Sequence, residues 1–221
     1  RMFEVSRLAG LFAITPEDPD EARLLGMAKS ALIGGTRLLQ YRDKTADTAR
    51  RLRLALALGA LCRQYGARFI VNDDLELAVR VAADGLHLGC NDGDLAEARQ
   101  RLPKGSLLGA SCYADFELAQ AAVAAGANYV AFGAVYPSPT KPHAVRAPLE
   151  LFSRCRDELG IPACAIGGIT LANAAPILSA GADMLAVITD LFAAPDISAR
   201  AQAFKQLFEE QPNDLSQPAT V

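Results

Sequence analysis

The chain has 221 residues, of which 51% are hydrophobic and 21% charged, a composition typical of a globular protein with one large domain or two small ones. Its net charge of −3 at pH 7 excludes a general electrostatic attraction to nucleic acid or to an anionic membrane surface. No apolar run approaches the roughly 20 residues of a transmembrane helix, so we expect neither a nucleic-acid nor a membrane partner.

Strand-like apolar runs alternate with helix-like segments along the whole chain. The expected strands are residues 11–14, 37–41, 68–71, 85–88, 107–110, 129–132, 163–166 and 184–188. The expected helices are residues 20–33, 45–65, 75–82, 95–101, 116–125, 149–158, 174–179 and 198–208. Eight such units predict an α/β fold of the (β/α)₈ TIM-barrel type. An open doubly wound sheet is the alternative, and eight units make it less favoured.

The barrel is expected to form a single domain over residues 1–210, followed by a flexible polar tail over 211–221. One four-residue motif recurs before expected strands, as Ala125-Gly126-Ala127-Asn128 and Ala180-Gly181-Ala182-Asp183. A less similar copy of the motif is Ala82-Ala83-Asp84-Gly85. Each copy indicates a helix end, a turn and the start of a buried strand.

The cysteines give no sign of a disulfide framework. The five cysteines are odd in number, scattered, and without a Cys-x-x-Cys pair; they are Cys62, Cys90, Cys112, Cys155 and Cys164. We therefore interpret them as small buried hydrophobic residues in a reducing cytoplasm. The first apolar run, 8–14, is too short for a signal peptide and predicts a strand.

The loops that follow barrel strands share one face, which is where barrel enzymes bind and react. After the second strand, alternation places Gln40, Arg42 and Lys44 on one side. Two cations at a barrel mouth favour binding of a multiply charged anion. The alternative is a solvated surface charge run.

Acidic side chains follow the third and fourth strands. Asp73 and Asp92 lie after neighbouring strands, so their carboxylates could converge on a Mg²⁺ ion shared with a phosphate. Asp74 and Asp94 are expected to cap the helices that follow. His87 lies within a strand and is interpreted as a core or supporting residue rather than a metal ligand.

A second anion site is expected where the last two strands end. Gly168 follows the seventh strand, and Ile188 and Thr189 end the eighth; glycines and free backbone N–H groups there are typical of a phosphate cup. A tight turn would also explain the glycines. Two anion sites in one cleft indicate two phosphorylated substrates, or one substrate with phosphates at both ends.

Taken in order, these motifs resemble the thiamine phosphate synthase (thiamine-phosphate pyrophosphorylase) family. The matching stretches are Gln40 to Lys44, Val71 to Asp73, Gly85 to Gly89 with Asp92, Gly109 to Ser111, Phe132 to Lys141, Ala165 to Ile169 and Ala186 to Thr189. The resemblance implies a Mg²⁺-assisted transferase that joins hydroxymethylpyrimidine diphosphate to thiazole phosphate. The products would be thiamine phosphate and pyrophosphate.

The resemblance also implies roles for single residues. The pyrimidine diphosphate would be bound by Gln40, Arg42, Lys44, Asn72, Ser111 and Lys141. Four of these, Arg42, Lys44, Ser111 and Lys141, would be catalytic. The thiazole phosphate would be bound by Ser138, Thr140, Gly168, Ile188 and Thr189. Asp73 and Asp92 would hold Mg²⁺.

The sequence departs from the family pattern at a few positions. Tyr113 stands where a histidine is often found, Cys90 where glutamine is common, and Thr189 where serine is common. Two rivals remain open: the related thiazole tautomerase, which depends on the histidine replaced here by Tyr113, and a non-catalytic binder of phosphorylated thiamine precursors. The protein could form a homo-oligomer, although no sequence patch indicates one.

Overall fold

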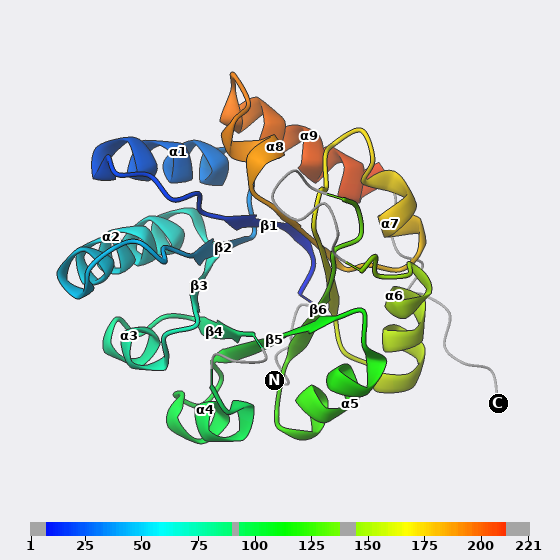
Figure 1. The fold of residues 1–221 in the computed structure, drawn as a ribbon. Coiled ribbons are helices and arrows are strands. Elements are labelled where there is room, and N and C mark those ends of the chain that lie inside the picture. The colour runs from blue at the N-terminus through cyan, green and yellow to red at the C-terminus, as the bar shows by residue number, and fades with distance from the viewer. Residues whose placement is uncertain (1–7, 90–92, 138–144, 211–221) are drawn as a thin grey trace, which may run out of the picture.

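The computed structural model describes residues 8–89, 93–137 and 145–210. Its eight strands form one closed barrel, in which each strand pairs in parallel with the next and the last pairs with the first. Helices surround the ring of strands (Figure 1). The (β/α)₈ TIM barrel expected from the sequence is confirmed.

The strands are β1 Gly10–Ile14, β2 Leu38–Tyr41, β3 Arg68–Asn72, β4 Gly85–Leu88, β5 Leu107–Tyr113, β6 Tyr129–Phe132, β7 Ala163–Ile166 and β8 Met184–Val187. The helices are α1 Glu21–Ile33, α2 Thr48–Tyr65, α3 Leu75–Arg80, α4 Leu95–Arg101, α5 Phe116–Ala124, α6 Glu150–Arg154, α7 Ala175–Ser179, α8 Thr189–Phe192 and α9 Ile197–Glu210. None of the helices within the described ranges is long and apolar enough to cross a membrane.

Several elements have bounds that differ from the sequence expectation; helix α2, for example, begins at Thr48 instead of residue 45. The fifth strand continues to Tyr113 instead of ending at residue 110. Helix α6 passes into a π-helical turn over Cys155–Leu159. The eighth strand ends at Val187, and Ile188 precedes the short helix α8, which the sequence did not predict. A four-residue helix gives too few positions for a periodic pattern to be recognised.

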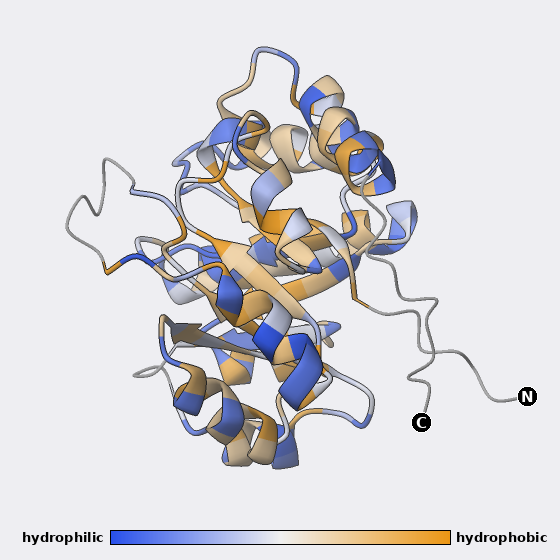
Figure 2. Ribbon diagram, turned by 90° about the vertical axis from the view of Figure 1, so that its right-hand side faces the viewer, coloured by the Kyte–Doolittle hydropathy of each residue, from blue (hydrophilic) through white to orange (hydrophobic). Residues whose placement is uncertain are grey.

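The side chains of the strands form two separate apolar cores. Alternate residues, such as Phe12, Leu38 and Ile70, fill the interior of the barrel. The residues between them, such as Leu39 and Val71, pack outwards against the helices. Figure 2 shows the apolar strands inside helices that carry many hydrophilic residues. This alternation determines which polar side chains reach the barrel mouth.

Aspartates begin the first five helices. The side chains of Asp20, Asp47, Asp74, Asp94 and Asp115 each accept a hydrogen bond from a backbone N–H in the first turn that follows. The expected caps Asp74 and Asp94 are therefore confirmed. Because these carboxylates satisfy the free N–H groups of helices, they set where the loops after β1 to β5 end.

The polar residue in each copy of the recurring motif accepts a hydrogen bond from the preceding strand. The Asn128 side chain accepts a hydrogen bond from the N–H of Leu108, at 2.8 Å. Asp183 does the same for Ala163 at 3.0 Å, and Asp84 for Phe69 at 2.8 Å. In each case the acceptor lies just before one strand and the N–H at the start of the preceding strand. The motif thus links adjacent strands at their N-terminal ends and helps to fix their register.

We expect an Asp183→Ala substitution to lower the free energy of unfolding by about 1–3 kcal/mol, because the buried N–H of Ala163 would lose its acceptor. Urea unfolding monitored by circular dichroism measures this change. Asp183→Asn is the matched control, since its amide oxygen can still accept the bond. Equal stability of the two variants would contradict the assigned role.

Candidate active site

Polar side chains gather at the C-terminal ends of β2 to β5. Gln40, Asn72, His87 and Ser111 each lie two residues beyond an interior position of the same strand, so they face the same barrel mouth. Asn72 lies beside His87 in the paired strands β3 and β4. Gln40 and His87 are buried. The mouth therefore has a floor of hydrogen-bonding groups.

The cations expected after β2 lie in a tightly held loop. Asp43 shapes this loop by accepting hydrogen bonds from the N–H groups of Thr45 and Ala46 and from the Thr45 hydroxyl. Burial raises the pKa of Asp43, but these hydrogen bonds outweigh it and leave the pKa below its usual value. The carboxylate consequently stays ionised and fixes the backbone just after Lys44.

Glu17 is a neighbour of both cations that sequence reasoning missed. Its Oε1 atom lies 3.5 Å from Nη1 of Arg42 and accepts a hydrogen bond of 3.2 Å from the Lys44 backbone N–H. Glu17 follows β1, whereas the cations follow β2. The sequence signal for Glu17 is its place in the loop that follows the first strand, on the face where polar residues gather.

Asp73 lies where β3 ends, in an unusual backbone conformation. Its φ of 62° is in the left-handed region, which costs a non-glycine residue about 1–3 kcal/mol. The Asp73 N–H donates to the His87 carbonyl at 2.9 Å, and Oδ2 lies 3.4 Å from Lys44 Nζ. The fold thus holds a carboxylate beside a cation at the mouth.

The donors at this position suit magnesium. Asp73 provides carboxylate oxygens and Asn72 a neighbouring amide oxygen, the hard donors that Mg²⁺ prefers. Within the described ranges no three His, Cys, Asp or Glu side chains form a group that could hold a metal. The second expected ligand, Asp92, lies outside the described residues.

The loops after β7 and β8 are joined to each other. Asp190 accepts a hydrogen bond of 2.9 Å from the Leu171 N–H and pairs with Arg200 at 2.6 Å. Gly168 has φ 61°, and a Cβ there would lie 2.8 Å from the Pro137 carbonyl oxygen. Glycine is therefore required sterically, and the tight-turn interpretation of Gly168 is part of the explanation.

The loop after β6 begins against the same glycines. The backbone N–H of Tyr136 donates to the Gly167 carbonyl at 3.2 Å, and that of Val135 to Ile166 at 3.0 Å. Ser138, Thr140 and Lys141 follow in sequence but lie outside the described residues. Of the expected thiazole phosphate residues, the structure thus describes only Gly168, Ile188 and Thr189.

A sequence model described as thiamine monophosphate synthase matches residues 11–191. The chain belongs to the thiamine monophosphate synthase family. It is 56% identical to the thiamine-phosphate synthase of Aromatoleum aromaticum over 92% of this chain and 98% of that protein. It is 57% identical to the thiamine-phosphate synthase of Chromobacterium violaceum over 91% of this chain and 97% of that protein.

A solved structure agrees with this family assignment. The chain superimposes on a thiamine phosphate pyrophosphorylase from Pyrococcus furiosus with a TM-score of 0.84 and 31% sequence identity, covering 95% of this chain and all of the other. The resemblance inferred from ordered motifs is therefore confirmed. The roles of individual site residues are not tested by these similarities and remain predictions.

In this member of the thiamine monophosphate synthase family, His87 lies beneath the barrel mouth and contacts Ser111. Its Nε2 lies 2.9 Å from the Ser111 hydroxyl oxygen. This agrees with the sequence interpretation of a core or supporting histidine. Tyr113, at the end of β5, has φ 53° and is 47% exposed. This tyrosine, one of the departures from the family pattern, thus lies at the surface, two residues beyond Ser111.

The four described cysteines of this family member are buried, and none of them forms a disulfide within the described ranges. Burial raises the pKa of Cys62 and of Cys112 to about 12, so both thiols stay protonated and unreactive at neutral pH. The interpretation of cysteines as small hydrophobic residues is confirmed for these four. Cys90 lies outside the described residues.

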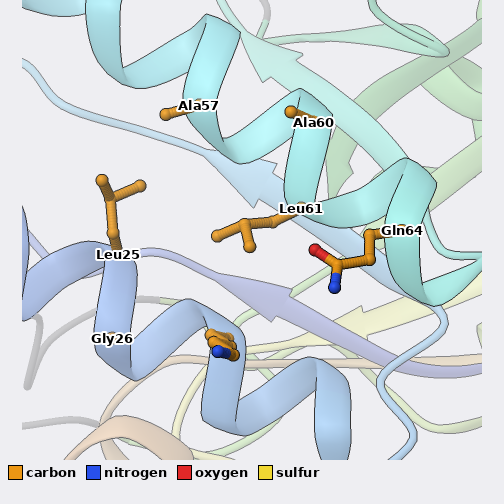
Figure 3. A pocket seen from close by; sticks show the side chains of 7 residues that line it. Leu25, Gly26, Ala57, Ala60, Leu61 and Gln64 are labelled. Atoms are coloured by element: carbon orange, nitrogen blue, oxygen red, sulfur yellow. The ribbon is translucent and has the colours of Figure 1, made fainter.

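A groove on the outer wall of the barrel is distinct from the site. It lies between α1 and α2 (Figure 3). Its lining is mostly apolar and comprises Leu25, Gly26, Lys29, Ala57, Ala60, Leu61 and Gln64. Its one cationic side chain is Lys29, and all of its lining residues belong to α1 and α2, away from the strand ends that carry the polar groups of the site.

Proposed function

We propose that this member of the family is a thiamine phosphate synthase that joins 4-amino-2-methyl-5-hydroxymethylpyrimidine diphosphate to 4-methyl-5-(2-hydroxyethyl)thiazole phosphate. The products are thiamine phosphate and pyrophosphate. One observation carries the assignment of the site: Lys44 and Asp73, from the ends of neighbouring strands, meet at 3.4 Å in the barrel mouth. A cation beside a carboxylate suits a diphosphate accompanied by a metal ion.

The reaction explains why the site needs no protein nucleophile. The bond between the pyrimidine methylene carbon and the diphosphate oxygen breaks, and its electron pair leaves with pyrophosphate. The aminopyrimidine ring delocalises the positive charge that remains. The thiazole nitrogen then supplies the electron pair of the new carbon–nitrogen bond. The protein has to stabilise the leaving group and orient the two rings.

The described residues supply these functions from several strand ends. Arg42 and Lys44 hold the negative charge of the diphosphate as it departs. Gln40, Asn72 and Ser111 fix the pyrimidine substrate by hydrogen bonds from the inner face of the barrel. On the opposite loops, Gly168, Ile188 and Thr189 receive the thiazole phosphate.

Further substrate and metal contacts come from residues outside the described ranges. Lys141 acts with Arg42 and Lys44 on the diphosphate, and Ser138 and Thr140 act with Gly168 on the thiazole phosphate. Asp73 and Asp92 would hold Mg²⁺, which would supply positive charge to neutralise the diphosphate. We further place the enzyme in the cytoplasm, as a single barrel domain over residues 1–210 that could form a homo-oligomer.

We expect purified protein to make thiamine phosphate from the two substrates in the presence of Mg²⁺ and none in excess EDTA. Chromatography of the product, with a parallel assay for released pyrophosphate, measures this. Reactions that lack one substrate serve as controls. A well-folded protein that forms no product would contradict the proposal. Isomerisation of a thiazole carboxylate phosphate would then favour the tautomerase, and calorimetric binding of thiazole phosphate alone would favour a binding protein.

A further inference from the structure

Three polar side chains from adjacent strands form a chain of hydrogen bonds inside the barrel. The hydroxyl of Tyr129 on β6 lies 2.9 Å from Nδ1 of His87 on β4. Nε2 of the same imidazole lies 2.9 Å from the hydroxyl oxygen of Ser111 on β5. Tyr129 is fully buried and His87 is 7% exposed. The chain thus runs from the dry core of the barrel to its mouth.

The phenol ring of Tyr129 is held in place by its neighbours. It packs edge-on against Phe12, with ring centroids 5.9 Å apart. It also occupies the space that a side chain at position 109 would need. A Cβ on Gly109 would lie 2.0 Å from Tyr129 Cζ and 2.3 Å from its hydroxyl oxygen. Gly109, two residues before Ser111 on the same strand, therefore makes room for the hydroxyl that contacts His87.

The surroundings of the phenol determine the direction of the hydrogen bonds. Among the described residues, the Tyr129 hydroxyl has one hydrogen-bond partner, Nδ1 of His87. Burial raises the pKa of Tyr129 well above its ordinary value, so the phenol keeps its proton. A buried hydroxyl proton without an acceptor is costly. Tyr129 therefore donates to Nδ1, which must be the unprotonated nitrogen of a neutral imidazole.

The donor–acceptor direction of the hydrogen bond from Tyr129 to His87 also sets the direction of the next bond, at the barrel mouth. With Nδ1 as acceptor, the ring proton is on Nε2, and His87 donates it to the Ser111 oxygen. The Ser111 hydroxyl then accepts from below, and its own hydrogen remains available for a substrate oxygen. In the opposite tautomer Ser111 would donate to His87 and could offer the substrate only a lone pair. An anionic leaving group needs a donor.

We propose that Tyr129, acting through His87, fixes Ser111 as a hydrogen-bond donor toward the departing diphosphate. Tyr129 and His87 are positioning residues in this arrangement, and neither touches the reacting atoms. The inference rests on the proposed function, in which Ser111 contacts the pyrimidine diphosphate. It gives a role to Tyr129 and Gly109, for which the sequence motifs indicated none.

The first experiment measures the tautomer of His87 in the protein without substrates. The chain has two histidines, His87 and His143, so a His143→Asn variant labelled with ¹⁵N-histidine reports on His87 alone. We expect nitrogen chemical shifts of a neutral ring with the proton on Nε2. A ring protonated on Nδ1 alone would overturn the proposal. This measurement does not depend on activity, so it still decides the polarity if the wild-type protein makes no thiamine phosphate.

A double-mutant cycle tests the consequence for turnover. Tyr129→Phe keeps the ring and removes the hydroxyl; we expect kcat to fall about tenfold, the effect of one hydrogen bond. KM for both substrates should change less than twofold. In a Ser111→Ala background, the same substitution should have no further effect. An equal fall in both backgrounds would show a general structural role and overturn the proposal.

Tyr41→Phe is the matched control. Tyr41 is also a buried strand tyrosine, but its hydroxyl has no hydrogen-bond partner among the described residues and it packs on the outer side of the barrel sheet. Its removal should leave kcat unchanged. Melting temperatures of both variants within a few degrees of wild type establish that the fold survives.

Discussion

An Asp73→Asn variant is expected to turn over at least ~1,000-fold more slowly than the wild type at saturating substrate and at the Mg²⁺ concentration that just saturates the wild type, because stabilisation by a bound metal is worth several kcal/mol. Asparagine tolerates the left-handed φ of 62° that this position adopts. The substitution therefore removes the carboxylate charge without changing the backbone. Its loss also removes the ion pair with Lys44 at 3.4 Å, so the site keeps its cations and has a neutral amide where the wild type has a negatively charged metal ligand.

Turnover measured against Mg²⁺ concentration tests this expectation. The wild-type protein should lose activity in EDTA and regain it when Mg²⁺ is restored, whereas the variant should need far more Mg²⁺. Asp74→Asn is the matched control, since Asp74 caps α3 and pairs with Arg51 at 3.3 Å. The control should affect stability alone. An unchanged Mg²⁺ requirement in Asp73→Asn would remove Asp73 from the metal site.

An Arg42→Ala variant is expected to lower kcat by about 100-fold or more, the usual effect of losing one donor that stabilises developing negative charge. The guanidinium lies in the loop that Asp43 shapes, 3.5 Å from Glu17. Its removal leaves that loop intact because the hydrogen bonds of Asp43 do not involve Arg42. Arg42→Lys should recover part of the activity, since lysine restores the charge but not the planar fork of donors.

Arg53→Ala is the control for loss of a positive charge. Arg53 lies on α2, where it pairs with Glu21 at 2.8 Å and its side chain is 61% exposed. We expect wild-type kinetics from this variant. Steady-state rates for both substrates, with circular dichroism to verify folding, make the comparison. Near wild-type turnover in Arg42→Ala would contradict the assignment of the diphosphate to this loop.

Sequence patterns were enough to predict the strands of the barrel, most of its helices and the loops that carry polar groups. Local patterns suffice for this, because strand alternation, helix-ending glycines and aspartate caps act within a few residues. Asp74 and Asp94 could thus be interpreted correctly without a structure. The order of strands also follows, since consecutive parallel strands joined by helices usually lie side by side. The match of ordered motifs to the thiamine phosphate synthase family came from the same local information.

Which of these side chains contact each other became apparent only from the folded structure. Glu17 meets Arg42 across the ends of β1 and β2, and Lys44 meets Asp73 across β2 and β3. Tyr129 reaches His87 over 42 positions of sequence, through space that Gly109 leaves open. Alternation predicts the face on which a residue lies. The partner depends on strand register and ring volume, which arise only when distant segments pack together.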